Sequence, residues 1–189
     1  MTTSFVSHLN PPPVPPAERA DIVDALHRFA AGQDLHDREL FDSAFSAMAK
    51  LDFTRPAADL GVSIPVFEGR QVIGDAVFSA IGRLDTTHTV TNPRITAYDG
   101  RRAGLFALVE AQHLPHDDHS RHLLLKNIYT MLLLKQDGRW IIDHMRITNV
   151  WKTGDPAVLF PAVPGTPRRV TLRAAPGDIE RVDHGGIEA

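Results

Sequence analysis

The spacing of apolar residues changes once along the chain, from a helical period to a strict alternation. Up to about residue 84, apolar side chains recur every three or four positions, which is typical of helices that bury one face. Beyond that point they alternate with polar side chains, which indicates strands. Helices followed by strands predict an α+β protein in which the helices are segregated from one sheet.

Three helices are expected in the first part of the chain, over residues 17–33, 37–45 and 70–83. Asp37 is expected to cap the second helix, because an aspartate side chain accepts hydrogen bonds from free N–H groups in a first turn. Residues 48–53 fit a short strand. Residues 54–70 are expected to be irregular, since two prolines and two glycines interrupt them.

The second part predicts an antiparallel meander with long strands near residues 102–113, 121–135 and 139–151. Residues 87–92 predict a further strand, which Pro93 interrupts. A strongly curved sheet whose open side is closed by three helices has a cone-shaped cavity. Such cavities are the usual place for a small-molecule site.

The domain is expected to span residues 17–153. Residues 1–16 contain five prolines and predict an extended arm, because proline supports neither a helix interior nor a central strand. Residues 154–189 contain five more prolines and predict an extended tail, with some strand character at residues 168–173.

Composition narrows the possible functions. A net charge of −3 gives no electrostatic footprint for nucleic acid, and the lack of cysteine excludes thiolate chemistry. No apolar run is long enough to span a membrane, and the first residues do not resemble a signal peptide, so a cytoplasmic protein is expected. Because the phosphate-binding glycine motifs are missing, no nucleotide cofactor is expected.

Four histidines lie close together in the segment from His113 to His122, with Asp117 and Asp118 between them. Imidazole and carboxylate groups are ligands for divalent metals, so a metal-binding loop is one interpretation. A solvated loop between two strands is the other, and it is favoured because connecting loops are polar by default. No metal is therefore expected.

His88 and Asp34 are the candidate catalytic pair. An inward-facing histidine on a strand would reach the cavity, and imidazole is suited to accept a proton near neutral pH. A carboxylate partner would fix its tautomer, and Asp34 at the end of the first helix could supply it. The alternative is a hairpin histidine and a capping aspartate without a chemical role.

The segments 17–45, 69–84, 87–92 and 137–146, in this order and spacing, resemble the SnoaL-like group of the nuclear transport factor 2-like superfamily. The resemblance implies a cone-shaped α+β barrel and similarity to scytalone dehydratase and dehydrochlorinase-type lyases. It also implies a His–Asp dyad, which falls on His88 and Asp34. The chain departs from the group at Met131, near the place where scytalone dehydratase has a second histidine.

Five further residues are candidates for the substrate-binding wall. Asn127, Tyr129 and Met131 share one face of their strand, and a buried Asn or Tyr needs a polar partner. Arg146 could bind an anionic oxygen, although a salt bridge on the outer side of the sheet fits it equally well. Trp151 could line the cavity mouth or cap the core.

The resulting hypothesis is a cofactor-independent lyase for a small, aromatic, hydroxylated molecule, with elimination of water, halide or a carbon fragment such as formaldehyde. The alternatives are a polyketide-cyclase or isomerase activity, and a non-catalytic binding or partner subunit. The strand at residues 123–135 is apolar on both faces, which indicates a homodimer or homotrimer packed through the convex face.

Overall fold

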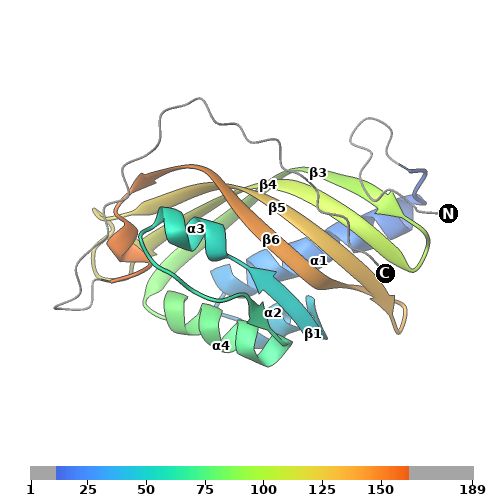
Figure 1. Ribbon diagram of the computed structural model, residues 1–189, viewed down its shortest axis with the longest axis horizontal. Coiled ribbons are helices and arrows are strands. Elements are labelled where there is room, and N and C mark those ends of the chain that lie inside the picture. Colours follow the sequence, from blue (N-terminus) through green and yellow to red (C-terminus); the bar gives the residue numbers. More distant parts are fainter. Residues whose placement is uncertain (1–11, 162–189) are drawn as a thin grey trace.

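The computed structural model describes residues 12–161, and within them it has four α-helices, one 3-10 turn and one six-stranded sheet (Figure 1). The helices are α1 (Pro16–Asp34), α2 (Arg38–Asp42), α3 (Thr54–Asp59) and α4 (Arg70–Ile81), and the 3-10 turn is η1 (Pro156–Val158). The strands are β1 (Phe45–Asp52), β2 (Phe67–Glu68), β3 (Leu84–Tyr98), β4 (Arg102–Pro115), β5 (Leu123–Gln136) and β6 (Arg139–Gly154).

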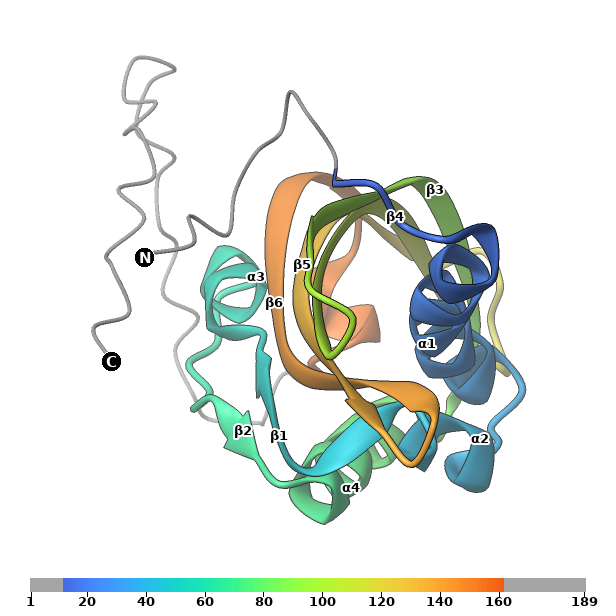
Figure 2. The ribbon, with the colours of Figure 1, turned by 90° about the vertical axis from the view of Figure 1, so that its right-hand side faces the viewer.

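The strand order is β2-β1-β6-β5-β4-β3, and every neighbouring pair is antiparallel except β1 with β6. Figure 2 shows the strands β6, β5, β4 and β3 as an arc, with α1 against its open side. This arrangement confirms the predicted cone-shaped α+β barrel with a curved, mostly antiparallel sheet.

Helix α1 fills the concave side of the sheet. Its fully buried residues include Ile22, Leu26 and Phe29, and burial of such side chains stabilises the fold by about 1.5–3 kcal/mol each. The helix passes close to α2 at Gly32, where an added Cβ atom would lie 2.6 Å from Phe41. The small residue therefore allows the two helices to come into contact.

The turn between α1 and α2 is built by its polar residues. His36 has a positive φ of 51°, which reverses the chain after the last turn of α1. Asp37 then accepts a hydrogen bond from the Leu40 N–H at 2.9 Å, which confirms the predicted cap. Asp34 is thereby held at the end of α1, over the edge of the sheet.

Two expectations about the elements are corrected. The second helix ends at Asp42 and not at residue 45, because Phe45 is buried where β1 pairs with Ile142 of β6. Residues 54–70 contain α3 and β2 and are not wholly irregular. The short β2 forms because it pairs with the end of β1, which is a tertiary contact that no local pattern contains.

Pro93 does not divide the strand at residues 84–98. Asn92 has a positive φ of 52°, and the register with β4 shifts between Thr91 and Arg94. The extra residues are taken up in a bulge, so that β3 continues to Tyr98.

Strand β6 contains two bulges, which reverse the direction of the side chains that follow. Leu132 pairs with His144 and Leu133 with Ile142, so Asp143 is an extra residue. Val150 is the second extra residue, because Lys126 pairs with Trp151 and the next residue, Asn127, pairs with Asn149. A one-residue insertion moves all later side chains to the other face.

The described chain extends past the expected domain end at residue 153. Val158 and Leu159 are buried, and the Val158 carbonyl accepts a hydrogen bond from Arg83 at 3.2 Å. Most of the predicted arm, most of the tail and the possible strand at 168–173 lie outside the described residues. Within the described range, no helix is both long and apolar enough to cross a membrane.

Candidate active site

Asp34 and His88 are in direct contact, although 53 residues separate them in the sequence. The Asp34 Oδ1 atom lies 2.6 Å from His88 Nδ1, and Oδ2 accepts a hydrogen bond from the His88 backbone N–H at 2.7 Å. Because a carboxylate only accepts, Nδ1 must carry the proton, which leaves Nε2 as the nitrogen with a free lone pair.

Thr86 adds a third hydrogen bond to this carboxylate, from Oγ1 to Asp34 Oδ1 at 2.9 Å. The His88 side chain is 3% exposed and that of Asp34 is 22% exposed. Burial raises the pKa of Asp34, but the hydrogen bonds and charge of His88, with the bond from Thr86, outweigh it and lower the pKa below its usual value. Asp34 is therefore ionised at neutral pH.

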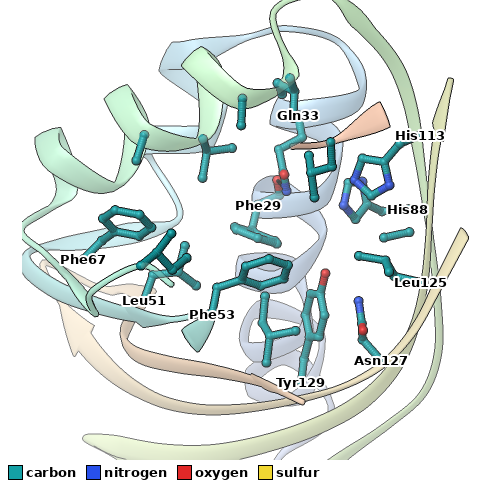
Figure 3. A pocket seen from close by; sticks show the side chains of 18 of the residues that line it. Phe29, Gln33, Leu51, Phe53, Phe67, His88, His113, Leu125, Asn127 and Tyr129 are labelled. Carbon is teal, nitrogen blue, oxygen red and sulfur yellow. Dashed lines mark hydrogen bonds between the residues drawn. The ribbon is translucent and has the colours of Figure 1, made fainter. Parts of the chain in front are cut away.

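His88 lines a cavity with a volume of about 120 Å³ (Figure 3). Its walls are formed by helices α1 and α4, by residues of all six strands, and by the two residues that follow η1. Most of the wall is apolar. The lining includes Phe29, Leu51, Phe53, Ile64, Phe67, Val77, Ala80, Ile81, Ala111, Leu125, Ile147, Leu159 and Phe160, and its polar members are Gln33, His88, His113, Asn127 and Tyr129.

His113 is a second imidazole in this cavity. Its ring centroid lies 6.2 Å from that of His88, and its Nδ1 atom lies 3.2 Å from the Leu123 carbonyl oxygen. Nδ1 therefore donates to this carbonyl. Burial, with a smaller effect from His88, lowers the pKa of His113 to about 4, so His113 is neutral at pH 7 and acts as a hydrogen-bond acceptor through Nε2.

Asn127 and Tyr129 are both buried and both reach the cavity from β5 (Figure 3). Burial raises the pKa of the Tyr129 hydroxyl far above its usual value, against a smaller opposite effect of the Asn127 amide, so this group stays protonated. The Asn127 Nδ2 atom is buried and has no hydrogen-bond partner among the described residues. An unpaired buried donor is costly, so this NH2 group, which lies beside the Tyr129 hydroxyl, is available to an oxygen acceptor in the cavity.

Asn149 fixes the orientation of the Asn127 amide. Its Nδ2 atom lies within hydrogen-bond distance of the Lys126 and Trp151 carbonyl oxygens, at 3.3 and 3.1 Å, so this atom must be the donor. It also lies 3.0 Å from Asn127 Oδ1, which must then be the acceptor. The Nδ2 group of Asn127 is consequently the one that remains for the cavity.

Met131, Arg146 and Trp151 are not among the residues that line the cavity, in contrast to their expected place. Met131 faces inward but lies further along β5, in the closed core. Arg146 is on the outer face, 3.1 Å from Asp52, because the bulge at Asp143 reverses the alternation. The second bulge sends Trp151 outward as well, where its ring lies 5.5 Å from the Lys126 ammonium group.

The histidine-rich segment divides between the cavity and the surface. His113 is buried, whereas His116 and His119 are exposed and each contact one oxygen of Asp85, at 2.9 and 2.7 Å. No group of three or more potential ligands within residues 12–161 has a geometry suited to a metal ion.

His113 is the functional candidate that the sequence interpretation missed. The predicted strand ends at this residue, but the sequence interpretation groups it with the polar segment that runs to His122. It belongs to the same face of β4 as Ala107, Val109 and Ala111, all of which are buried. Extending this alternation by two residues would have placed His113 in the cavity. Nothing comparable points to Gln33 or Phe53, whose positions depend on how α1 and β1 pack.

Residues 17–146 match the family model of the SnoaL-like domain. The chain belongs to the SnoaL-like family. Its cone-shaped barrel is that of the nuclear transport factor 2-like superfamily. The matched range covers Asp34, His88, His113, Asn127 and Tyr129, so all of these polar groups lie within the SnoaL-like domain.

A relative of this SnoaL-like chain is the terrestric acid biosynthesis cluster protein E of Penicillium crustosum. The two are 30% identical over 148 residues, which cover 75% of this chain and 89% of the relative.

Two solved structures show the same fold. A candidate scytalone dehydratase of Novosphingobium aromaticivorans is 17% identical, with a TM-score of 0.62, over 73% of this chain and 87% of that one. A hexachlorocyclohexane dehydrochlorinase is 20% identical, also with a TM-score of 0.62, over 79% of this chain and 96% of that one.

Proposed function

We propose that the protein is a cofactor-independent lyase for a small, ring-containing molecule that carries oxygen. The observation that carries the proposal is the contact of 2.6 Å between Asp34 and His88 at the wall of a mostly apolar cavity. A buried imidazole that is oriented by a carboxylate is a typical general base, and a purely structural histidine would not need a cavity beside it.

In the proposed reaction, His88 Nε2 takes a proton from a carbon next to a carbonyl group. The electrons of the broken C–H bond form an enolate, whose oxygen accepts hydrogen bonds from Asn127 Nδ2 and the Tyr129 hydroxyl. Such donors stabilise the charge that develops in the transition state. Asp34 stabilises the imidazolium that His88 becomes.

The enolate then collapses, a carbon–carbon double bond forms, and the group on the neighbouring carbon leaves with its electron pair. If that group is hydroxide, the His88 imidazolium returns its proton to it, so one molecule of water is released. The same step with a halide releases the halide and a proton. The dehydratase and dehydrochlorinase named among the structures of this fold support an elimination of this kind.

An isomerase is the second candidate, and the state of His113 favours it. His113 is neutral and donates its N–H to Leu123, so it cannot protonate a leaving group. His88 is then the proton carrier in the cavity. Return of its proton to a different carbon would shift a double bond and eliminate nothing.

Four simple compounds distinguish elimination from isomerisation and show which group is eliminated. 3-Hydroxycyclohexanone and 3-chlorocyclohexanone would lose water or chloride and give cyclohexenone, which absorbs in the ultraviolet. 2-(Hydroxymethyl)cyclohexanone would lose water if His88 takes the α-proton. If His88 instead takes the hydroxyl proton, the C–C bond breaks, formaldehyde is released, and the enolate left behind takes the proton back from His88 to give cyclohexanone. Exchange of the α-protons of cyclohexanone in D2O, followed by NMR, reports the proton transfer alone.

The proposal expects at least one of these reactions for the wild-type protein and a loss of about 10²–10⁴-fold for His88→Ala. Exchange without elimination would favour the isomerase. If none of the four compounds reacts, the proposed lyase and isomerase activities are both wrong. If His88→Ala is as active as wild type, His88 is not the base.

A further inference from the structure

The wall of the cavity carries no charged side chain. Among the described residues that line it there is no Lys, Arg, Asp or Glu. Arg146, the cation that the sequence interpretation placed there, is 61% exposed on the outer face and paired with Asp52. An anion in this cavity would therefore find no counter-charge.

The titratable groups of the wall do not supply a net positive charge in its place. His88 is paired with the carboxylate of Asp34, so a protonated His88 leaves this pair without net charge. His113 is neutral because burial lowers its pKa to about 4, and the Tyr129 hydroxyl keeps its proton. The nearest charge that bears on the site is the carboxylate of Asp34, directly behind His88. The negative charge of Asp34 repels anions. A ligand carboxylate that is buried in this cavity would have no cationic partner, and burial of an unpaired charge is very costly.

The size of the cavity limits the ring system that it can hold. Its volume is about 120 Å³, and an engineered cavity of ~150 Å³ binds benzene. The space is therefore of the order of a single six-membered ring and too small for a fused ring system. Phe29 lines it and packs edge-to-face against Tyr129 and His88, with ring centroids 6.0 and 6.4 Å apart, so a ring in the cavity would lie against an aromatic surface.

The unpaired Nδ2 group of Asn127 defines the substituent. It is buried, faces the cavity and is held in this orientation by Asn149. A neutral oxygen acceptor, such as a ketone, satisfies this donor without bringing a charge. A hydrocarbon of the same shape leaves it unpaired.

We propose that the cavity selects uncharged, single-ring compounds with a carbonyl oxygen and rejects carboxylates of the same size. The selection is made by the uncharged wall and by the Asn127 amide. This inference rests on the proposed function only in that it takes the same cavity as the active site, and it makes no assumption about which group is eliminated.

Three ligands of similar shape test it. Acetophenone has the carbonyl, benzoate has the carboxylate, and ethylbenzene has neither. Titration of the 15N-labelled full chain at pH 7.5 would follow the side-chain NH2 resonances of Asn127, which are assigned by their loss in Asn127→Leu. Acetophenone is expected to shift them and to bind about tenfold more tightly than ethylbenzene. Benzoate is expected to bind at least tenfold more weakly than acetophenone.

Two variants separate the causes of this selection. Asn127→Leu should remove the preference for acetophenone over ethylbenzene while both compounds still bind. Ile64→Arg places a cation at the cavity wall, so it should raise the affinity for benzoate at least tenfold, whereas the matched variant Ile64→Leu should not. As a control for folding, the hydrogen-exchange protection and the melting temperature of each variant are compared with those of wild type.

The proposal is overturned if benzoate binds wild type as tightly as acetophenone, if none of the three compounds binds, or if acetophenone leaves the Asn127 resonances unmoved. These outcomes are independent of turnover. Selective binding of acetophenone together with an active His88→Ala variant would contradict the general-base mechanism but not the selectivity.

Discussion

The carboxylate of Asp34 contacts His88 twice, through the ring Nδ1 at 2.6 Å and through the backbone N–H at 2.7 Å. The second contact fixes the carboxylate relative to the strand, and the first fixes the ring relative to the carboxylate. The imidazole is therefore oriented before any ligand arrives, which lowers the entropy cost of proton transfer.

Removal of either member of the pair should abolish most of the activity. His88→Ala deletes the base, and Asp34→Asn deletes the charge that stabilises the imidazolium, so each is expected to cost about 10²–10⁴-fold in the dehydration of 3-hydroxycyclohexanone. The double variant should be little worse than the worse single one, because the two residues act as a unit.

A matched control for this prediction lies on the surface. Asp85 also contacts histidines, at 2.9 and 2.7 Å, but its partners His116 and His119 are outside the cavity. Asp85→Asn should keep the wild-type rate. A loss equal to that of Asp34→Asn would mean that the rate does not report on the cavity pair.

Thr86→Val should reduce the rate by about tenfold. Valine keeps the shape of threonine, but it removes the hydrogen bond to Asp34 Oδ1 and leaves the carboxylate less firmly held. The effect should vanish in an Asp34→Asn background, because Thr86 acts through this carboxylate. Thr89→Val, on the same strand with an exposed side chain, is the control; an equal loss there would contradict the role of Thr86.

Stability should fall as the pH is lowered from 6.5 to 4, because of His113. Its pKa is about 4 in the folded protein and near 6.5 in the unfolded chain, so over this window the unfolded state binds the proton and the folded state does not. The free energy of unfolding should decrease by about 3 kcal/mol.

Urea denaturation at several pH values measures this decrease, and His113→Leu should flatten it. The pKa of His144 is also lowered by partial burial. Its effect on the free energy of unfolding is the same in wild type and in His113→Leu, so it cancels when the two proteins are compared. Asp34 acts in a different window: its lowered pKa gives stability above its usual value of 3.8, which is lost only at lower pH. An unchanged slope in His113→Leu would contradict the lowered pKa, because it would show that folding does not change the protonation of His113.

A homodimer or homotrimer packed through the convex face remains a prediction. The outer face of β4 and β5 carries partly exposed apolar residues, namely Phe106, Leu108, Ile128, Leu132 and Leu134. Light scattering should give two or three times the chain mass of 20.8 kDa. Leu132→Glu combined with Ile128→Glu should yield the monomer, whereas Leu35→Glu, at an exposed residue of the α1–α2 turn, should not.

The order of the main elements and the two catalytic candidates, His88 and Asp34, are predictable from the amino-acid sequence alone. A change from helical to alternating period is a local property, because it follows from which side chains one helix or strand must bury. The alternation along β5 likewise placed Asn127 and Tyr129 correctly on the inner face. The family resemblance then connected Asp34 with His88, which no local pattern could join.

Where a bulge interrupts the alternation of inward and outward side chains along a strand, the side chains that face the cavity depend on the tertiary structure. The bulges at Asp143 and Val150 are features of the pairing of β6 with β5, and they turn Arg146 and Trp151 outward. The neutral state of His113 depends on its burial between paired strands, which lowers its pKa more than the hydrogen bond to the Leu123 carbonyl raises it. Register and burial are properties of strands paired across long sequence distances, so the period of a single strand does not contain them.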